Sequence, residues 1–244
     1  MITKNLSPMI ETGFIKNRLD SQLYPYTMKR LTNDDVNQVI KLHNEVIDAL
    51  VDPDLCWRFP VDYIERYLGE EGITVGVFVE KRLIAFRVLY FPGCRPENPG
   101  LDIGLHDSEL EQVAHLPLSN VHQEFTGSSL QKAMTLQAIA IAKQTREFRY
   151  LCSNVSPKNY ASMTEKFEIG MWVAKLKIKY GGFLRYIFSK DMLQPWQLSQ
   201  EEKAIFIPST DSLRQMELLE QGYCGFQRSQ FQGKKGILFG KRVK

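Results

Sequence analysis

The stretch Val121-His122-Gln123-Glu124-Phe125-Thr126-Gly127-Ser128-Ser129-Leu130-Gln131 decides the fold, because a β-rich run ends in it and a helix begins. The small residues at 127–129 precede apolar residues at helical spacing: Leu130, Ala133, Met134, Ala138 and Ile141. The start of such a helix presents free backbone N–H groups and the positive end of the helix dipole. The stretch therefore predicts either an anion-binding turn or only a well-capped helix. No dinucleotide-binding or Walker glycine pattern occurs in the chain.

The β-rich run before the turn, residues 113–121, contains Pro117. Proline has no amide hydrogen to donate to a strand ladder. We therefore predict a strand with a bulge or a local loss of pairing at this proline.

The rest of the chain alternates between helical and strand periodicities. The predicted elements are a strand at 27–31, helices at 36–50 and 61–68, a hairpin of 73–79 and 83–91, a strand at 148–154, a helix capped by Ser156-Pro157 and stopped by Gly170, a hairpin of 172–180 and 183–189, a helix at 211–220, and two short strands around 232–236. Residues 94–104 are predicted to be irregular, and His43 to be a hydrogen-bonded core histidine. This order predicts a mixed α/β sheet.

The composition is that of a globular protein: 244 residues with 43% hydrophobic, 24% charged and 11% aromatic content. Disordered and low-complexity classes are excluded. There is no 18-residue uncharged apolar run and no signal-like apolar segment near the N-terminus, so we expect a cytoplasmic protein with no membrane partner. The four cysteines lie far apart with no histidine at ligand spacing, which predicts reduced thiols and no metal site.

The formal charge of +3 is too small to indicate a nucleic-acid partner, but the positive charges are clustered. No acidic residue follows Glu220, and the last 17 positions hold six cations: Arg228, Lys234, Lys235, Lys241, Arg242 and Lys244. This tail is either a solvated surface or attracts a polyanion such as a phosphorylated cofactor. Binding of DNA by the tail is a third alternative, which we do not expect.

The turn resembles the acyl-coenzyme-A-binding motif of the GNAT N-acetyltransferase superfamily, V-x-P-E-Y-(Q/R)-G-x-G-(I/L)-(G/A). The matching residues are Val121, Glu124, Phe125, Gly127 and Leu130. The departures are Gln123 for proline, Thr126 for Gln/Arg, Ser129 for the second glycine and Gln131 for the final small residue.

A second segment, which follows Asn154, resembles the strand-five and helix-four region of the same superfamily. Asn159, Ser162 and Gly170 fall in register, and Met171 takes the aromatic position. Residues 179–182 with Arg185 are similar to a subgroup of larger bacterial GNAT proteins with a C-terminal extension. The resemblance implies a mostly antiparallel sheet flanked by helices, divided into an N-terminal arm (1–26), a GNAT-like domain (27–190) and an α+β extension (191–244) packed on it.

The resemblance also implies acetyl-CoA as co-substrate and assigns residues to it. The residues implied to bind the coenzyme are Val121, Phe125, Thr126, Gly127, Ser128, Ser129, Leu130, Gln131, Asn159 and Ser162. A lysine-like amine acceptor is protonated at neutral pH, so a base or a water chain must remove its proton. His115 stands where the family often has a carboxylate, so it is either this base or a residue that only packs or hydrogen-bonds in the sheet. The helix-four tyrosine that serves as general acid falls at Lys166, which leaves Tyr160 as the substitute.

The implied function is transfer of an acetyl group from acetyl-CoA to an amine by an N-acetyltransferase. The alternative is a coenzyme-binding sensor or partner-binding module with little catalytic activity. The acceptor is set by segments here at about 51–60 and 180–184, and Trp57, Phe59 and Tyr63 line its entrance or belong to the core. A homodimer is possible in this family, and the sequence does not identify the acceptor.

Overall fold

The computed structural model describes residues 9–199 and 203–243 and divides the chain into two compact units. The first contains residues 1–53, 58–90 and 116–146, and the second contains residues 54–57, 91–115 and 147–244. Residues 1–8 of the predicted arm, 200–202 of the predicted extension and Lys244 of the basic tail lie outside the described residues. The boundaries predicted after residue 26, between the arm and the GNAT-like domain, and after residue 190, between this domain and the extension, stay predictions.

The first unit contains an antiparallel sheet with the strand order β1-β2-β3-β4, and the short strand β6 also pairs with β4. The bounds are β1 (Met9–Lys16), β2 (Leu23–Leu31), β3 (Gly72–Val79), β4 (Arg82–Tyr90) and β6 (Ser119–Val121). Strand β2 begins four residues before the predicted start at Thr27, because its first half pairs with β1 in a hairpin.

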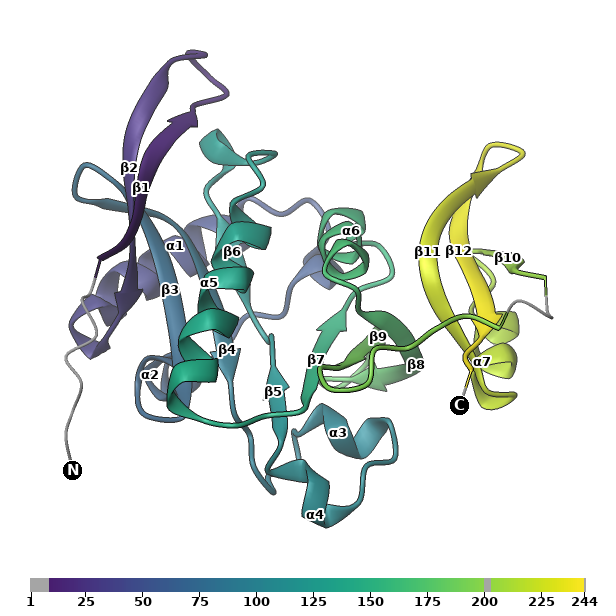
Figure 1. The fold of residues 1–244 in the computed structure, drawn as a ribbon. Coiled ribbons are helices and arrows are strands. Elements are labelled where there is room, and N and C mark those ends of the chain that lie inside the picture. The colour runs from purple at the N-terminus through teal and green to yellow at the C-terminus, as the bar shows by residue number, and fades with distance from the viewer. Residues whose placement is uncertain (1–8, 200–202, 244) are drawn as a thin grey trace. The chain divides into compact units, whose positions relative to one another are not determined.

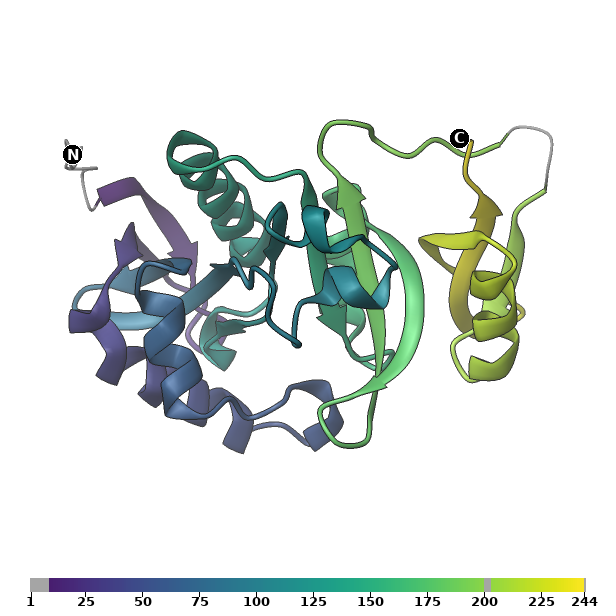
Figure 2. The same cartoon turned by 90° about the horizontal axis from the view of Figure 1, so that it is seen from below.

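Helices cover both faces of this sheet. Helices α1 (Val36–Asp48) and α2 (Val61–Leu68) contact one face, and α5 (Leu130–Thr145) contacts β3 and β4 from the other (Figures 1 and 2). All eight residues of β3 are therefore buried. A capping box between Thr32 and Asp35 starts the helical segment, as the acidic residues there predict.

His43 is confirmed as a hydrogen-bonded core histidine. The Phe59 N–H donates to its Nε2 at 3.0 Å, so the ring proton lies on Nδ1, 2.8 Å from Asn120 Oδ1. Burial lowers the pKa of His43, which keeps the ring neutral. The imidazole therefore joins α1 to β6 and to the segment before α2.

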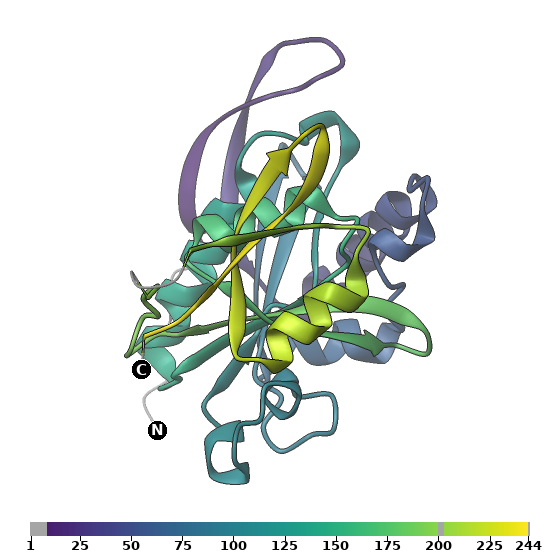
Figure 3. The same ribbon diagram turned by 90° about the vertical axis from the view of Figure 1, so that its right-hand side faces the viewer.

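The second unit contains a sheet with the order β5-β7-β9-β8-β11-β12-β10. Strand β5 (Val113–His115) runs parallel to β7 (Tyr150–Val155), and β9 (Phe183–Asp191) and β8 (Trp172–Lys179) continue antiparallel. The C-terminal strands are β10 (Ile205–Pro208), β11 (Tyr223–Phe231) and β12 (Lys234–Lys241). Helix α6 (Tyr160–Glu168) follows β7, and α7 (Ser212–Glu220) lies beside the C-terminal strands (Figure 3). Gly225 pairs with Val173, and a Cβ at this glycine would come within 3.0 Å of the Val173 Cβ.

Several predicted elements differ from the structure. Residues 94–104 are not wholly irregular: α3 (Pro99–Asp102) forms there because the Asn98 side chain caps it and proline occupies its first turn. Residues 107–110 form the short helix α4 (Asp107–Leu110). Helix α6 is capped by Asn159 rather than Ser156, because the Ser156 hydroxyl instead accepts from the Lys158 N–H within a turn.

Two further differences concern the strands. A register shift between Val173 and Lys175 breaks the predicted alternation of β8, so Val173 is buried although the pattern places it outside. Ile178, which the pattern places inside, is exposed near the end of the strand. Strands β11 and β12 are long rather than short, with nine and eight residues, because they pair with each other along almost their whole length. Strand β10 was not predicted.

Replacing Asn98 by alanine is expected to lower the free energy of unfolding by roughly 2–3 kcal/mol. The fully buried side chain donates to the carbonyl groups of Gly93 and Leu110 and accepts from the Gly100 N–H. Urea unfolding measures the effect, with Asn37→Ala on the exposed side of α1 as the control. Equal stability of the two variants would contradict this role of Asn98.

Candidate functional site

The turn before α5 has the backbone of an anion-binding loop. After the 3-10 turn η3 (Gln123–Phe125), Gly127 has φ = 78° and Ser129 has φ = 59°, both in the left-handed region. Residues in this conformation turn successive N–H groups toward one side, as in anion-binding nests. A Cβ at Gly127 would meet no atom within 4 Å, so the space above the glycine is open.

The amide groups of this turn are available to a ligand. Within the described residues, no acceptor is found for the N–H groups of Gly127, Ser128, Leu130 and Gln131, and the first helical bond runs from Ala133 to Ser129. The Ser128 hydroxyl donates to the Phe125 carbonyl at 2.6 Å. A row of free N–H groups at the start of a 16-residue helix is a site for phosphate or another anion.

Buried side chains hold this turn in place. Phe125 and Leu130 are buried, and the Phe125 ring packs edge-to-face on Tyr24 with centroids 6.5 Å apart. Val121 pairs with Ala85, which fixes β6 on β4. Phe125 and Leu130 can therefore offer a ligand only their backbone groups.

Arg18 supplies a side-chain cation to the turn. Its Nη1 donates to the Thr126 hydroxyl at 2.7 Å, and its own N–H donates to the Glu124 carbonyl at 2.7 Å. The Thr126 hydroxyl in turn donates to the Gln123 carbonyl at 3.1 Å. No sequence pattern indicated Arg18, because it lies in the β1–β2 connection, 108 residues before Thr126.

The predicted strand at 113–121 is divided, as Pro117 requires. Strand β5 pairs with β7 in the second unit, and β6 pairs with β4 in the first. The Leu118 carbonyl accepts from the Val88 N–H at 3.0 Å, so pairing with β4 resumes directly after the proline. The predicted coenzyme residues at 121–131 thus belong to the first unit, and His115, Asn159, Tyr160 and Ser162 to the second.

His115 lies buried on β5 with a neutral ring. Burial is the main cause that lowers its pKa to about 3, and the positive charges of Lys179 and Lys166 act in the same direction. Within the described residues, its buried Nε2 has no hydrogen-bond partner. A group with this pKa is a weak base toward an alkylamine.

The predicted coenzyme residues on α6 also have roles within the protein. Asn159 Oδ1 accepts from the Ser162 N–H at 3.0 Å, and its Nδ2 donates to the Leu55 carbonyl at 3.3 Å. The Tyr160 ring lies under two cations, with the Arg228 and Lys235 groups 4.9 and 5.0 Å from its centroid. Lys166, at the position of the family tyrosine, is buried and pairs with Glu165 at 2.5 Å.

The two segments predicted to select the acceptor, at about 51–60 and 180–184, contact each other through residues of the second unit. Trp57 stacks on Tyr180 with centroids 5.0 Å apart and an interplanar angle of 11°. Arg185 is buried and pairs with Asp54 at 2.7 Å. Phe59 and Tyr63 instead pack edge-to-face with each other in the first unit.

The cysteines are free thiols. Burial raises the pKa of Cys56 to about 11, that of Cys152 to about 12 and that of Cys224 to about 11, so these thiols stay protonated at neutral pH. The described residues contain no group of three or more His, Cys, Asp or Glu side chains that could hold a metal ion. None of their helices combines the length and apolarity needed to cross a membrane.

No family model and no curated protein matches the sequence. Solved structures do match. NAA60 of Arabidopsis thaliana in complex with acetyl-CoA has a TM-score of 0.55 over 69% of this chain and 99% of its own, at 11% identity. An N-acetyltransferase of Staphylococcus aureus Mu50 has a TM-score of 0.52 over 69% and 99%, at 18% identity. A GNAT-family acetyltransferase of Streptococcus pneumoniae has a TM-score of 0.52 over 68% and 98%, at 14% identity.

The chain has the GNAT fold. The predicted mixed, mostly antiparallel sheet flanked by helices is confirmed. The residues that resemble the family motif and the free amide groups coincide at the turn before α5.

Ser129 and Gly127 offer a matched test of the turn's backbone. Ser129→Gly is expected to stabilise the protein by about 0.5–1 kcal/mol, because relief of left-handed strain exceeds the added freedom of the unfolded chain. Gly127→Ala is expected to destabilise it by about 1 kcal/mol, since its Cβ has space but its backbone conformation does not suit alanine. Thermal unfolding of both variants checks the opposite signs, and a shift in the same direction would contradict the assigned conformations.

The lowered pKa of His115 predicts acid sensitivity. Between pH 6.5 and about 3 the unfolded chain binds a proton at this ring that the folded chain does not. As the pH is lowered from 6.5 to about 3, the free energy of unfolding therefore decreases, by about 1.4 kcal/mol per pH unit for one proton. His115→Gln is expected to reduce the slope by about one proton relative to the wild-type protein. Urea unfolding across this pH range measures both proteins, and equal slopes would contradict the prediction.

Proposed function

We propose that this protein transfers an acetyl group from acetyl-CoA to an amine. The observation that carries the proposal is the turn before α5, where free amide groups, left-handed residues and an arginine meet at a helix start. The GNAT fold supports acyl transfer from acetyl-CoA in general. The acceptor amine and the turnover are the parts that need an experiment.

The residues of the turn suit the pyrophosphate of coenzyme A. A pyrophosphate needs several donors and at least one cation, and the N–H groups at 127–131 with Arg18 provide them. Gly127 leaves room for close approach, and the Ser128 and Ser129 hydroxyls add polar groups. Bound acetyl-CoA would supply an acetyl group activated as a thioester.

We infer that Arg18 replaces the Gln/Arg of the family motif. Thr126 stands at the motif position and is too short to reach a phosphate in the same way, but its hydroxyl accepts a bond from Arg18. The exposed guanidinium keeps four further N–H donors for a phosphate.

His115 is assigned a hydrogen-bonding role rather than that of the main base. Its buried Nε2 has no hydrogen-bond partner among the described residues, so this atom can form a hydrogen bond with a bound molecule, but a pKa of about 3 gives it little capacity to take a proton from an amine. Water is then the acceptor of the amine proton. Tyr160, the substitute acid for the departing thiolate, keeps its ring against Arg228 and Lys235.

Calorimetric titration of acetyl-CoA and CoA tests the coenzyme site. The wild-type protein is expected to bind both, and Gly127→Trp to lose binding because the indole fills the open space above the turn. Gly233→Trp is the matched control, since Gly233 also has a left-handed φ and open space but lies in the β11–β12 turn. No heat with the wild-type protein at millimolar coenzyme would overturn the proposal. Binding of the coenzyme without acetylation of any amine in a panel would instead support the alternative function, a coenzyme-binding module with little catalytic activity.

Arg18→Gln is expected to weaken CoA binding about tenfold, the effect of one charge-assisted contact (~1.4 kcal/mol). The loss should shrink in high salt. Arg30→Gln, on β2, is the matched control. S-acetylpantetheine lacks the phosphates, so its affinity should not change in Arg18→Gln, and an equal loss for this fragment would contradict the assigned contact.

A further inference from the structure

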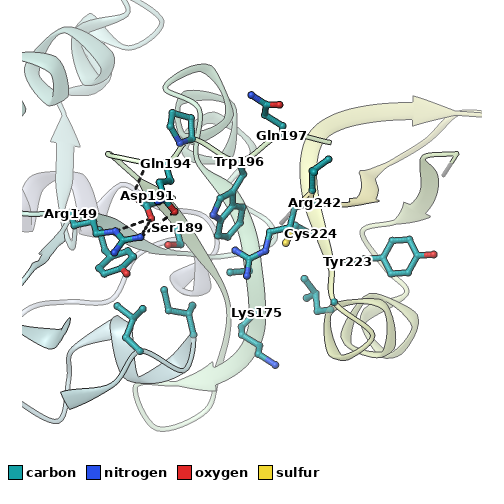
Figure 4. A pocket seen from close by; sticks show the side chains of 18 residues that line it. Arg149, Lys175, Ser189, Asp191, Gln194, Trp196, Gln197, Tyr223, Cys224 and Arg242 are labelled. Atoms are coloured by element: carbon teal, nitrogen blue, oxygen red, sulfur yellow. Dashed lines mark hydrogen bonds and ion pairs between the residues drawn. The ribbon is translucent and has the colours of Figure 1, made fainter. Parts of the chain in front are cut away.

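The second unit contains a cavity of about 860 Å³ that the proposed function does not use (Figure 4). One wall comes from β7, β8 and β9, and the other comes from the C-terminal extension. None of the residues predicted to bind coenzyme or to act in catalysis lines it. Its volume is in the range of sites for small organic molecules.

The extension builds its wall with fixed contacts. Trp196 packs edge-to-face on Trp172 with centroids 5.5 Å apart. The Val243 N–H donates to the Gln197 carbonyl at 2.8 Å, and Leu198 bridges to Arg242. The segment after β9 and the end of β12 are therefore joined where both line the cavity.

Arg242 is oriented by an aromatic ring. Its guanidinium lies 4.5 Å from the centroid of Trp196, and Figure 4 shows the two side chains together between the sheet and the extension. A guanidinium stacked on a ring keeps its N–H donors in its own plane, directed away from the ring. Those donors can bind a carboxylate or a phosphate in the cavity.

The charges of the cavity do not balance. Its lining has three cations, Arg149, Lys175 and Arg242, and one carboxylate, Asp191. Arg149 donates twice to Asp191, at 2.7 and 2.9 Å, so these two neutralise each other. Burial acts to raise the pKa of Asp191, but the bonds from Arg149 and from two amide groups outweigh it, which keeps the carboxylate ionised. Within residues 9–199 and 203–243, neither Lys175 nor Arg242 forms an ion pair with a carboxylate.

The remaining lining offers an apolar surface and a polar floor. Ile103 and Leu105 are partly buried and pack against Val113 and Tyr150, and Leu219 of α7 adds to the apolar part. At the floor, the buried Ser189 hydroxyl lies 3.9 Å from the Cys152 thiol and adds a polar group to the lining.

We propose that this cavity binds a small organic anion, with its carboxylate or phosphate at Arg242, in the positive field to which Lys175 contributes, and its apolar body against Ile103 and Leu105. Such a ligand supplies the negative charge that the lining lacks and covers the apolar surface. The C-terminal extension thereby acquires a role of its own, as one wall of a second binding site.

Phenyl phosphate is a suitable probe, since it joins a phosphate to an apolar ring. Its binding is followed by tryptophan fluorescence, to which Trp196 contributes, and by calorimetry. Inorganic phosphate and phenol, each with half of the chemistry, are expected to bind at least tenfold more weakly than phenyl phosphate.

Arg242→Gln should weaken the binding of phenyl phosphate roughly tenfold or more, as expected for one charge-assisted contact, and Lys175→Gln should weaken it to a smaller extent, since it removes only a nearby charge. Lys234→Gln removes the same charge from the exposed start of β12 and should have no effect. Acetyl-CoA affinity should stay unchanged in all three variants, which separates this proposal from that of the coenzyme site. Equal binding of phenyl phosphate by the three variants, or no binding by the wild-type protein, would overturn the proposal.

Discussion

Pro117 imposes the constraint on which the rest of the structure depends. In a continuous strand from 113 to 121, the backbone N–H groups donate hydrogen bonds to the neighbouring strands. Pro117 has no N–H group to donate. Strand β5 therefore ends at His115 with β7 as its partner, and β6 begins at Ser119 with β4 as its partner. The pairing of β6 with β4 fixes where the chain enters the turn before α5, and the pairing of β5 with β7 fixes the burial of His115.

The local patterns of the sequence predicted most of the fold. Helix α2 and the β3–β4 hairpin follow directly from apolar spacing, and Thr32 with Asp35 marks the start of the segment that leads into α1. The failures lie where the structure depends on individual hydrogen bonds and on strand register, which apolar spacing does not specify. The shift in β8 exists only against β9, and α3 exists because Asn98 is buried between Gly93 and Leu110.

The candidate site divides in the same way. The turn at 126–129 was predictable because glycine and serine before a helix have a local meaning, and its motif has the same register. The properties of His115 were not, because the pKa of an imidazole depends on how deeply the sheet buries it. For Asn159, the sequence suggested a coenzyme ligand, and the structure adds that this side chain caps α6 and holds the Leu55 carbonyl.

The bond between Arg18 and Thr126 has a consequence for how this protein and its relatives can change. A long polar side chain at position 18 or at position 126 can donate to a ligand at the same turn. A lineage that gains arginine or glutamine at 126 is therefore free to lose Arg18. A lineage with a short residue at 126 must keep the cation on the β1–β2 connection. The two positions should therefore covary over evolution, although neither is informative when only one sequence is read.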